Sequence, residues 1–206
     1  ALSTGHTSVS VSDRFTGLQA TLNVDVIAPQ QAPLPLAGES IQEGHAVSTD
    51  VNGDGYMDVI MSSPGANYDA YRGGLAMLWL GNGDGLDASP ARTFSKSGWE
   101  DQMGRGLALG DFEADGFVDL VIGSPLEDPA AGTNGGQVQV YSGGSGLLFS
   151  ADPTFTSAGD HGYDYYGQSV AACDINGDGY DDLIVGSYDD EDREGLTTYT
   201  NQGSIK

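Results

Sequence analysis

The stretch Asp174-Ile-Asn-Gly-Asp-Gly-Tyr-Asp-Asp182 has two earlier counterparts in this chain. They are Asp50-Val-Asn-Gly-Asp-Gly-Tyr-Met-Asp58 and Asp111-Phe-Glu-Ala-Asp-Gly-Phe-Val-Asp119. The three segments start about 60 residues apart, and similarity at a fixed period is the sequence signature of a repeat architecture. We name them loop 1 (50–58), loop 2 (111–119) and loop 3 (174–182).

The similarity extends to both sides of the loops. Each loop follows a glycine-led apolar stretch and precedes a run of three apolar residues and a serine-containing turn. A second glycine-led stretch then follows. In repeat order, the leading stretches are 44–47, 104–109 and 167–172, the apolar runs are 59–61, 120–122 and 183–185, and the final stretches are 74–80, 136–141 and 195–199.

These short apolar runs, bounded by Gly, Pro, Asn and Asp, predict strands joined by tight turns, and no segment has a sustained helical period. Three consecutive apolar residues suit a strand that is covered on both faces. A repeat of about 60 residues with three or four strands has the size of a propeller blade. The sequence therefore predicts an all-β chain of three propeller-type blades, at about 38–98, 99–158 and 159–206, which cannot close a ring.

The first part of the chain lacks this pattern. Residues 7–12 and 20–26 alternate between polar and apolar types on either side of a polar turn at 13–17, which predicts a β-hairpin within residues 1–28. This strand pair resembles the end of an immunoglobulin-like or cadherin-like module. Residues 29–37 contain Pro33 and Pro35 and read as a semi-rigid linker.

The loops have the composition of calcium sites. Calcium takes six to eight oxygen ligands, which Asp and Asn at alternate positions of a turning backbone can supply. Positions 1, 3, 5 and 9 carry oxygen-bearing side chains, position 6 is glycine, and position 7 offers its backbone carbonyl. The predicted ligands are Asp50, Asn52, Asp54, Tyr56 and Asp58 in loop 1, Asp111, Glu113, Asp115, Phe117 and Asp119 in loop 2, and Asp174, Asn176, Asp178, Tyr180 and Asp182 in loop 3.

An EF-hand begins with the same residues but requires a bidentate Glu at position 12 and a following helix. Position 12 is Met61, Ile122 and Val185 in the three repeats, and each lies in an apolar strand-like run. The EF-hand interpretation therefore fails, and so does a helical dockerin-type variant. About three calcium ions, one in each loop, remain the prediction.

Strand, loop, strand and serine-containing turn together resemble the FG-GAP repeat family, whose members include the β-propeller of integrin α subunits. The resemblance covers residues 38–206. It implies that each loop joins two strands of one blade and binds calcium through the residues named above. The namesake Phe-Gly is replaced by Glu43-Gly44, Met103-Gly104 and Tyr166-Gly167, so the resemblance predicts the contacts between blades less well than the loops.

Charge limits the possible partners. The chain has 30 Asp and Glu against 7 Lys and Arg, a formal net charge of −23. Nucleic acids and anionic membrane surfaces are excluded as partners because both are bound through clustered basic residues. The longest apolar segment, 75–80, is far shorter than the roughly 18 residues that a membrane span needs.

A catalytic role has little support in the sequence. His6, His45 and His161 are isolated, and no serine lies in a nucleophile-elbow pattern. The single cysteine, Cys173, excludes an internal disulfide and is expected to be a small buried hydrophobe. We therefore expect a protein that is not an enzyme.

Two classes of function remain. The first is a calcium-stiffened module of a secreted or cell-surface protein, serving adhesion or assembly through a protein partner or through its own exposed strand edges at 20–26 and 196–201. The second is a glycan-binding propeller, for which aromatic residues should repeat at one position per blade; Trp79 and Trp99 do not. The segments 160–166 and 188–192, rich in Tyr and acidic residues, are either a recognition surface or solvated acidic loops.

Overall fold

The structure is a computed structural model that describes residues 4–12, 19–27, 44–130, 132–146, 148–188 and 204–205. The chain divides into two compact units, Ala1–Pro35 and Leu36–Lys206. The predicted linker at 29–37 lies outside the described residues. Among those residues there is no helix with the length and apolar character that a membrane crossing requires.

The first unit contains a two-stranded antiparallel sheet. Strand β1 (Thr4–Ser12) pairs with β2 (Gln19–Ile27) in a register that places Thr4 opposite Ile27 and Ser12 opposite Gln19. Both strands include the alternating segments from which the sequence predicted a hairpin, and each is longer than predicted. The resemblance to the end of an immunoglobulin-like or cadherin-like module stays a prediction.

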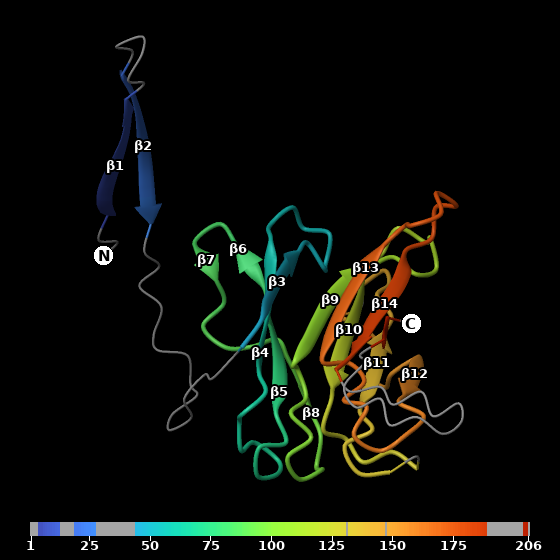
Figure 1. Cartoon of the computed structure of the whole chain (residues 1–206). Helices are drawn as coiled ribbons and strands as arrows, with labels where there is room; N and C mark the ends of the chain where they lie inside the picture. The colour runs from blue at the N-terminus through green and yellow to red at the C-terminus, as the bar shows by residue number, and fades with distance from the viewer. Residues whose placement is uncertain are drawn as a thin grey trace. The chain divides into compact units, whose positions relative to one another are not determined.

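The second unit contains three antiparallel sheets, which follow one another along the chain (Figure 1). The first sheet is β3 (Ala46–Thr49), β4 (Asp58–Ser63), β5 (Leu75–Trp79) and β8 (Arg92–Ser95). The second is β9 (Gly106–Gly110), β10 (Asp119–Ser124), β11 (Gln137–Tyr141) and β12 (Phe155–Ala158). The third is β13 (Ser169–Cys173), β14 (Asp182–Ser187) and β15 (Ser204–Ile205), and a small hairpin of β6 (Gly81–Asn82) and β7 (Gly85–Leu86) follows the first three strands.

Among the described residues, the third strand of the third sheet is β15. The predicted strand at 195–199 is outside the described residues, as is the predicted edge at 196–201. Strand β15 pairs with β14 and places Ser204 opposite Ser187. The equivalent pairs in the first and second sheets are Ser63 with Leu75 and Ser124 with Gln137. The β14–β15 connection is therefore longer than its counterparts, which a repeat of nearly constant length did not suggest.

The three sheets pack face to face, and alternate residues of one strand serve two interfaces. Leu120 and Ile122 of β10 join the apolar cluster that includes Ile60 and Leu78 of the first sheet. Val121, between them, joins the cluster with Val185 of the third sheet. Every residue of β10 is buried. The expected strand covered on both faces is thus observed in the second sheet, and the described residues do not close a ring.

The outer face of the third sheet is more exposed. Val170 of β13 packs toward the second sheet, whereas Ser169, Ala171 and Cys173 alternate on the opposite face and are exposed. Side chains along a strand point to opposite faces in turn. The expectation that Cys173 is buried was therefore wrong, because it lies on the face of β13 that does not meet the second sheet.

Glycines permit the closest approach between successive sheets. Gly74 and Gly136 each form a parallel backbone bridge, with Met103 and Tyr166 respectively. Gly136 has φ +80°, and a Cβ built there would lie 2.3 Å from the backbone oxygen of Tyr166. Only glycine combines this left-handed backbone with the absence of a side chain.

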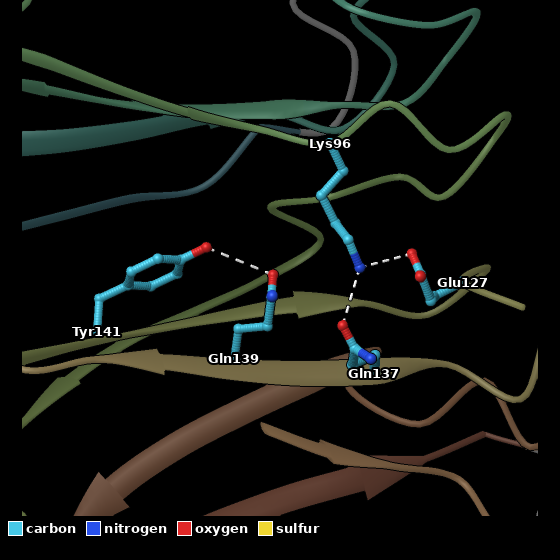
Figure 2. A network of polar contacts seen from close by, with 5 residues as sticks. All are labelled: Lys96, Glu127, Gln137, Gln139 and Tyr141. Carbon is cyan, nitrogen blue, oxygen red and sulfur yellow. Dashed lines mark hydrogen bonds and ion pairs between the residues drawn. The ribbon is translucent and has the colours of Figure 1, made fainter. Parts of the chain in front are cut away.

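Polar contacts also cross from the first sheet to the second (Figure 2). Lys96, which follows β8, lies 2.6 Å from a carboxylate oxygen of Glu127 and donates a 2.8 Å hydrogen bond to Gln137 of β11. Arg92 of β8 donates to four backbone carbonyls at 148–151, and its guanidinium lies 4.4 Å from the ring centroid of Phe94. These contacts join the two sheets at both ends of β8.

Asp101 is a buried carboxyl group at the same junction. Its side chain is 5% exposed. Burial and a hydrogen bond with Glu127 raise the pKa of Asp101 to about 7, and the charge of Lys96 opposes the shift. The unfolded value is about 3.9. Between these pH values the folded chain holds a proton that the unfolded chain lacks, so this group's stabilising contribution falls as pH rises.

A comparison with Asp101→Asn tests this behaviour, because Asn keeps the size of the side chain and does not titrate. We expect the variant to gain stability relative to the parent chain by about 1–3 kcal/mol between pH 5 and pH 8, since one pKa unit corresponds to about 1.4 kcal/mol. Urea unfolding of both proteins at several pH values measures the difference. A difference that stays constant over this range contradicts the prediction.

Candidate calcium loops

Each candidate loop joins the first two strands of one sheet. Loop 1 lies between β3 and β4, loop 2 between β9 and β10, and loop 3 between β13 and β14, all at the same end of the stacked sheets (Figure 1). The strands reach the loops as neighbours in an antiparallel ladder, with Thr49 opposite Asp58 in the first sheet and Cys173 opposite Asp182 in the third. Each loop is therefore held at both ends by paired backbone.

The aspartate at position 1 curls each loop around its own carboxylate. Asp50 accepts hydrogen bonds from the backbone N–H groups of Gly53, Asp54 and Gly55, at 2.8, 3.1 and 2.8 Å. Asp174 accepts the same three bonds in loop 3, at 2.7, 3.1 and 2.9 Å. These backbone bonds, first the one from Gly179, lower the pKa of Asp174.

Loop 2 has the same form, with two backbone N–H groups donating to its position-1 aspartate. Asp111 accepts from the N–H groups of Asp115 and Gly116, at 3.1 and 2.9 Å. Its position 4 is Ala114, with φ +52°, where loops 1 and 3 have glycines with φ +76° and +77°. A left-handed backbone costs a non-glycine residue free energy, so loop 2 keeps the shared form despite an unfavourable residue.

Positions 3 and 5 accept bonds from the turning backbone. The amide oxygen of Asn52 accepts from the N–H of Asp54, and the carboxylate of Asp54 accepts from Tyr56, both at 2.9 Å. The corresponding bonds in loop 3 are 2.8 and 3.0 Å, and Asp115 likewise accepts from Phe117. Glu113 differs, because its carboxylate accepts a bond from the hydroxyl of Ser142.

The aspartate at position 9 closes the loop from inside the fold. Asp58 is 0% exposed; one carboxylate oxygen accepts from Val51 of the loop and the other from Gly81, which follows the third strand. Asp119 is 1% exposed and accepts in the same way from Phe112 and Gly143. In loop 3, half-buried Asp182 accepts from Ile175.

Burial raises the pKa of Asp119, and the bonds from Phe112 and Gly143 oppose the shift. The acidic neighbours Glu113 and Asp111 raise it further. A bound cation would reduce the desolvation cost and the repulsion together, because an opposite charge favours the ionised carboxylate.

The donor set fits a hard cation. Each loop offers carboxylate or amide oxygens at four positions and a backbone carbonyl at position 7, which are the ligands that calcium prefers. Carboxylate oxygens that already accept an N–H keep a second lone pair for a metal. The side chains at position 7, Tyr56, Phe117 and Tyr180, are partly exposed, and this position would contribute its backbone carbonyl.

The described residues contain one group of three His, Cys, Asp or Glu side chains whose ligand atoms all lie within 4.8 Å of one another, and it lies outside the loops. It consists of Asp160, His161 and Asp164, in the connection between the second and third sheets. The loop carboxylates are not drawn together to this degree. Their shared arrangement comes from backbone hydrogen bonding, and the fifteen assigned ligands stay predictions.

The sequence pointed to the segment 160–166 as a recognition surface or a solvated loop, but not to this cluster of Asp160, His161 and Asp164. Asp164 is 1% exposed and accepts a 2.9 Å bond from the N–H of His161, whose ring nitrogen lies 3.2 Å from Asp160. Asp101 lies three residues before Gly104, between the first and second sheets. Asp164 lies three residues before Gly167, between the second and third sheets. The repeated Asp three residues before glycine is a sequence signal that could have predicted a buried carboxylate here.

Exposed aromatic rings surround these connections. Tyr71 and Trp99 pack with ring centroids 5.7 Å apart, and Trp99 is 76% exposed. Tyr165 contacts Tyr163 and Tyr188 at 6.5 and 6.1 Å. The segment 160–166, for which the sequence left a recognition surface and a solvated acidic loop open, thus includes the exposed aromatic side chain of Tyr163. Residues 189–192 lie outside the described part of the chain. Trp79 is buried, so the two tryptophans have unlike environments.

Comparison with known proteins gives a consistent result. The FG-GAP repeat family matches residues 45–76, 103–141 and 166–205, so each match contains one loop and the strands that flank it. FG-GAP repeats often bind calcium.

Similar sequences occur in two kinds of protein. The phosphatidylinositol-glycan-specific phospholipase D of Bos taurus is 32% identical over 151 residues, which is 68% of this chain and 18% of the bovine protein. Integrin alpha-7 of Rattus norvegicus is 34% identical over 166 residues, 75% of this chain and 14% of the integrin. Integrin alpha-IIb of Homo sapiens is 32% identical over 168 residues, 74% of this chain and 16% of the integrin.

This chain therefore spans less than a fifth of the length of these relatives, and what they share with it is the repeat region. Three family matches, each placed on one of the three sheets, agree with the repeated loop and strand geometry. The chain belongs to the FG-GAP repeat family.

Proposed function

We propose that this chain is a calcium-binding module of a secreted or cell-surface protein, with a role in adhesion, assembly or structural support. One observation carries the proposal. All three loops are curled by the position-1 aspartate around a set of oxygen donors, at the same end of three stacked sheets. Bound calcium would neutralise part of the net charge of −23 and stiffen the turn between the first two strands of each sheet.

The proposal assigns no catalytic activity to this chain. Its relatives include a phospholipase and integrins, and the chain matches less than a fifth of either, so an enzyme's activity does not transfer with the match. The acidic loops serve as metal ligands in this proposal, without a nucleophile or a general base. Location outside the cell is supported by the same resemblance, and millimolar extracellular calcium matches the weak affinity expected for such modules.

The proposed partner is a protein or a second copy of this chain. Among the described residues, both strands of the β1–β2 hairpin are sheet edges, and an unpaired edge offers backbone groups to another strand. Light scattering at increasing concentration tests self-association. A monomer throughout would restrict the proposal to a different protein as the partner.

A glycan ligand is the alternative, and the exposed Tyr71–Trp99 pair favours it because aromatic faces can stack on sugars. The pair has no equivalent at the same place in the next repeat, where a glycan-binding propeller would repeat it. Glycan-array binding with and without calcium, on the parent chain and on Trp99→Ala, distinguishes the two functions. Binding that is lost in the variant would support the glycan reading.

Calorimetric titration tests the metal sites directly. We expect uptake of about three calcium ions, with dissociation constants of about 10⁻⁴ to 10⁻³ M. Asp54→Ala, Asp115→Ala and Asp178→Ala should each remove one site, because each deletes the carboxylate at position 5. Magnesium should bind much more weakly, since its small octahedral shell suits a flexible oxygen loop poorly.

Asp84→Ala is the matched control for these variants. Asp84 is an exposed aspartate in the β6–β7 turn, outside the three loops. Its replacement should leave the calcium stoichiometry unchanged. No measurable calcium uptake by the parent chain would contradict the proposed function.

A further inference from the structure

Loops 2 and 3 are joined by two hydrogen bonds through one residue. The carboxylate of Asp181 accepts a 2.8 Å bond from the backbone N–H of Asp111, and the N–H of Asp181 donates a 3.0 Å bond to the carbonyl of Asp111. Asp181 is position 8 of loop 3, and Asp111 is position 1 of loop 2. Position 8 is Met57 in loop 1 and Val118 in loop 2, neither of which has an acceptor to offer in this way.

Gly110 makes this close approach possible. A Cβ at Gly110 would lie 2.7 Å from the Cβ of Ala172 and 3.1 Å from a carboxylate oxygen of Asp181. The residues that precede the other two loops, Thr49 and Cys173, both carry side chains. The junction of loops 2 and 3 therefore combines a glycine that admits the neighbouring sheet with an aspartate that bonds to it.

The same contact lies on a continuous path between two predicted ligands. The Asp181 N–H belongs to the peptide group of the Tyr180 carbonyl, and in a trans peptide these two groups point in opposite directions. The Asp111 carbonyl, which accepts the bond, shares a peptide group with the N–H of Phe112, which donates to the carboxylate of Asp119 at 3.0 Å. Tyr180 is position 7 of loop 3, and Asp119 is position 9 of loop 2.

We propose that Asp181 is a positioning residue that couples calcium binding in loop 3 to calcium binding in loop 2, so that each ion raises the affinity of the other loop. The proposal rests on the proposed function. A cation on the Tyr180 carbonyl orders its peptide group, and the two hydrogen bonds between Asp181 and Asp111 then hold the first residue of loop 2 in one conformation. Loop 2 therefore loses less conformational entropy when it binds its own ion. The Asp181 carboxylate is the acceptor of one of these two bonds.

Repulsion between two bound cations opposes the coupling, and the two effects respond differently to salt. Added salt screens charges that are separated through solvent, whereas the short hydrogen-bonded path between the loops is not screened. The coupling should therefore increase when ionic strength rises from low to physiological. Binding couplings are also reciprocal, so loop 2 must act on loop 3 by the same factor.

Calcium titration of the ¹⁵N-labelled whole chain, followed by NMR, resolves the loops individually. The amide signals of Gly55, Gly116 and Gly179 report loops 1, 2 and 3, because each N–H bonds to the position-1 aspartate of its own loop. We expect Asp178→Ala, which disables loop 3, to weaken calcium binding in loop 2 about fivefold, the lower end of the usual range for coupled sites. Loop 1 should be unaffected and serves as the internal control.

The coupling should disappear in the Asp181→Val background, where Asp178→Ala should change loop 2 less than twofold. Valine is the residue that loop 2 itself has at this position. Asp181→Asn retains an acceptor oxygen and should keep most of the coupling. Gly110→Ala leaves the carboxylates of Asp111 and Asp181 in the sequence, but its methyl group pushes the second and third sheets apart. It should therefore abolish the coupling, as Asp181→Val does.

Two results would overturn the inference. One is a loop 2 affinity that does not respond to Asp178→Ala in the parent chain, a measurement that does not depend on any change at Asp181. The other is an equal response with and without the Asp181 carboxylate. In both cases calcium still binds and the proposed function stands, whereas absence of binding in all three loops would instead refute the proposed function.

Discussion

Removal of calcium with a chelator should lower the melting temperature of this chain, and added calcium should restore it. At about 1 mM calcium and dissociation constants of about 10⁻⁴ to 10⁻³ M, mass action stabilises the fold by roughly 0.4–1.4 kcal/mol per site. Three sites therefore contribute about 1–4 kcal/mol. At about 2–4 °C per kcal/mol for a chain of this length, the melting temperature should fall by roughly 2–16 °C.

The physical origin of this effect is charge crowding. In the absence of a cation, the acidic side chains of each loop repel one another at the turn between two core strands, and Asp58 and Asp119 do so from buried positions. Each of Asp54→Ala, Asp115→Ala and Asp178→Ala should remove about one third of the calcium-dependent increment.

Calorimetry with calcium, with magnesium and with chelator measures the effect, and Asp84→Ala is the control that should behave as the parent chain does. A matched increase in potassium chloride separates specific binding from general screening, because screening acts on all exposed charges. If the chelated protein melts at the same temperature as the calcium-loaded one, the loops are polar turns without a bound metal.

Gly136→Ala should be severely destabilising. The residue has φ +80°, which costs a non-glycine residue about 1–2 kcal/mol. Its new Cβ would lie 2.3 Å from the backbone oxygen of Tyr166 and 2.4 Å from the backbone nitrogen, so the backbone of the second or third sheet must shift. Overpacking of this kind costs about 1–3 kcal/mol. The total, about 2–5 kcal/mol, is a large share of the stability of an ordinary domain.

Gly146→Ala is the matched control. Gly146 has a similar φ of +70°, but nothing lies within 4 Å of a Cβ built there. It should lose only the backbone cost of about 1–2 kcal/mol. Denaturant unfolding of both variants measures the difference, which isolates the close contact with Tyr166. Equal losses in the two variants would show that the contact between the sheets does not limit stability.

Several features of this molecule could be derived from sequence because they are local. In each loop the assigned ligands lie within nine residues, and the bonds that Asp50 and Asp174 accept from the following N–H groups depend on that spacing alone. The apolar run at 120–122 likewise predicted a strand covered on both faces. The structure confirms it, because β10 meets a sheet on each side. Repetition strengthened these predictions because one pattern occurred three times.

Other predictions failed or were incomplete where a partner distant in the sequence decides. The burial of Cys173 depends on which face of β13 meets the second sheet, and a short run such as Val170-Ala-Ala172 does not reveal that face. The strand expected at 195–199 lies outside the described residues, and the pairing of Ser204–Ile205 with β14 was not anticipated. A sheet register is a long-range property, which a nearly constant repeat length does not set.

The sequence by itself determined the repeat, the all-β class and the oxygen-rich composition of the three loops, because each depends on residue types at short spacing. The tertiary structure alone decided how the repeats touch: Gly136 against Tyr166, Lys96 against Glu127, and Asp181 against Asp111. The residues in each of these pairs lie 30 or more positions apart in the sequence. Such contacts form only when neighbouring sheets stack, because the packing of their apolar faces sets which backbone and side-chain groups come within hydrogen-bonding distance.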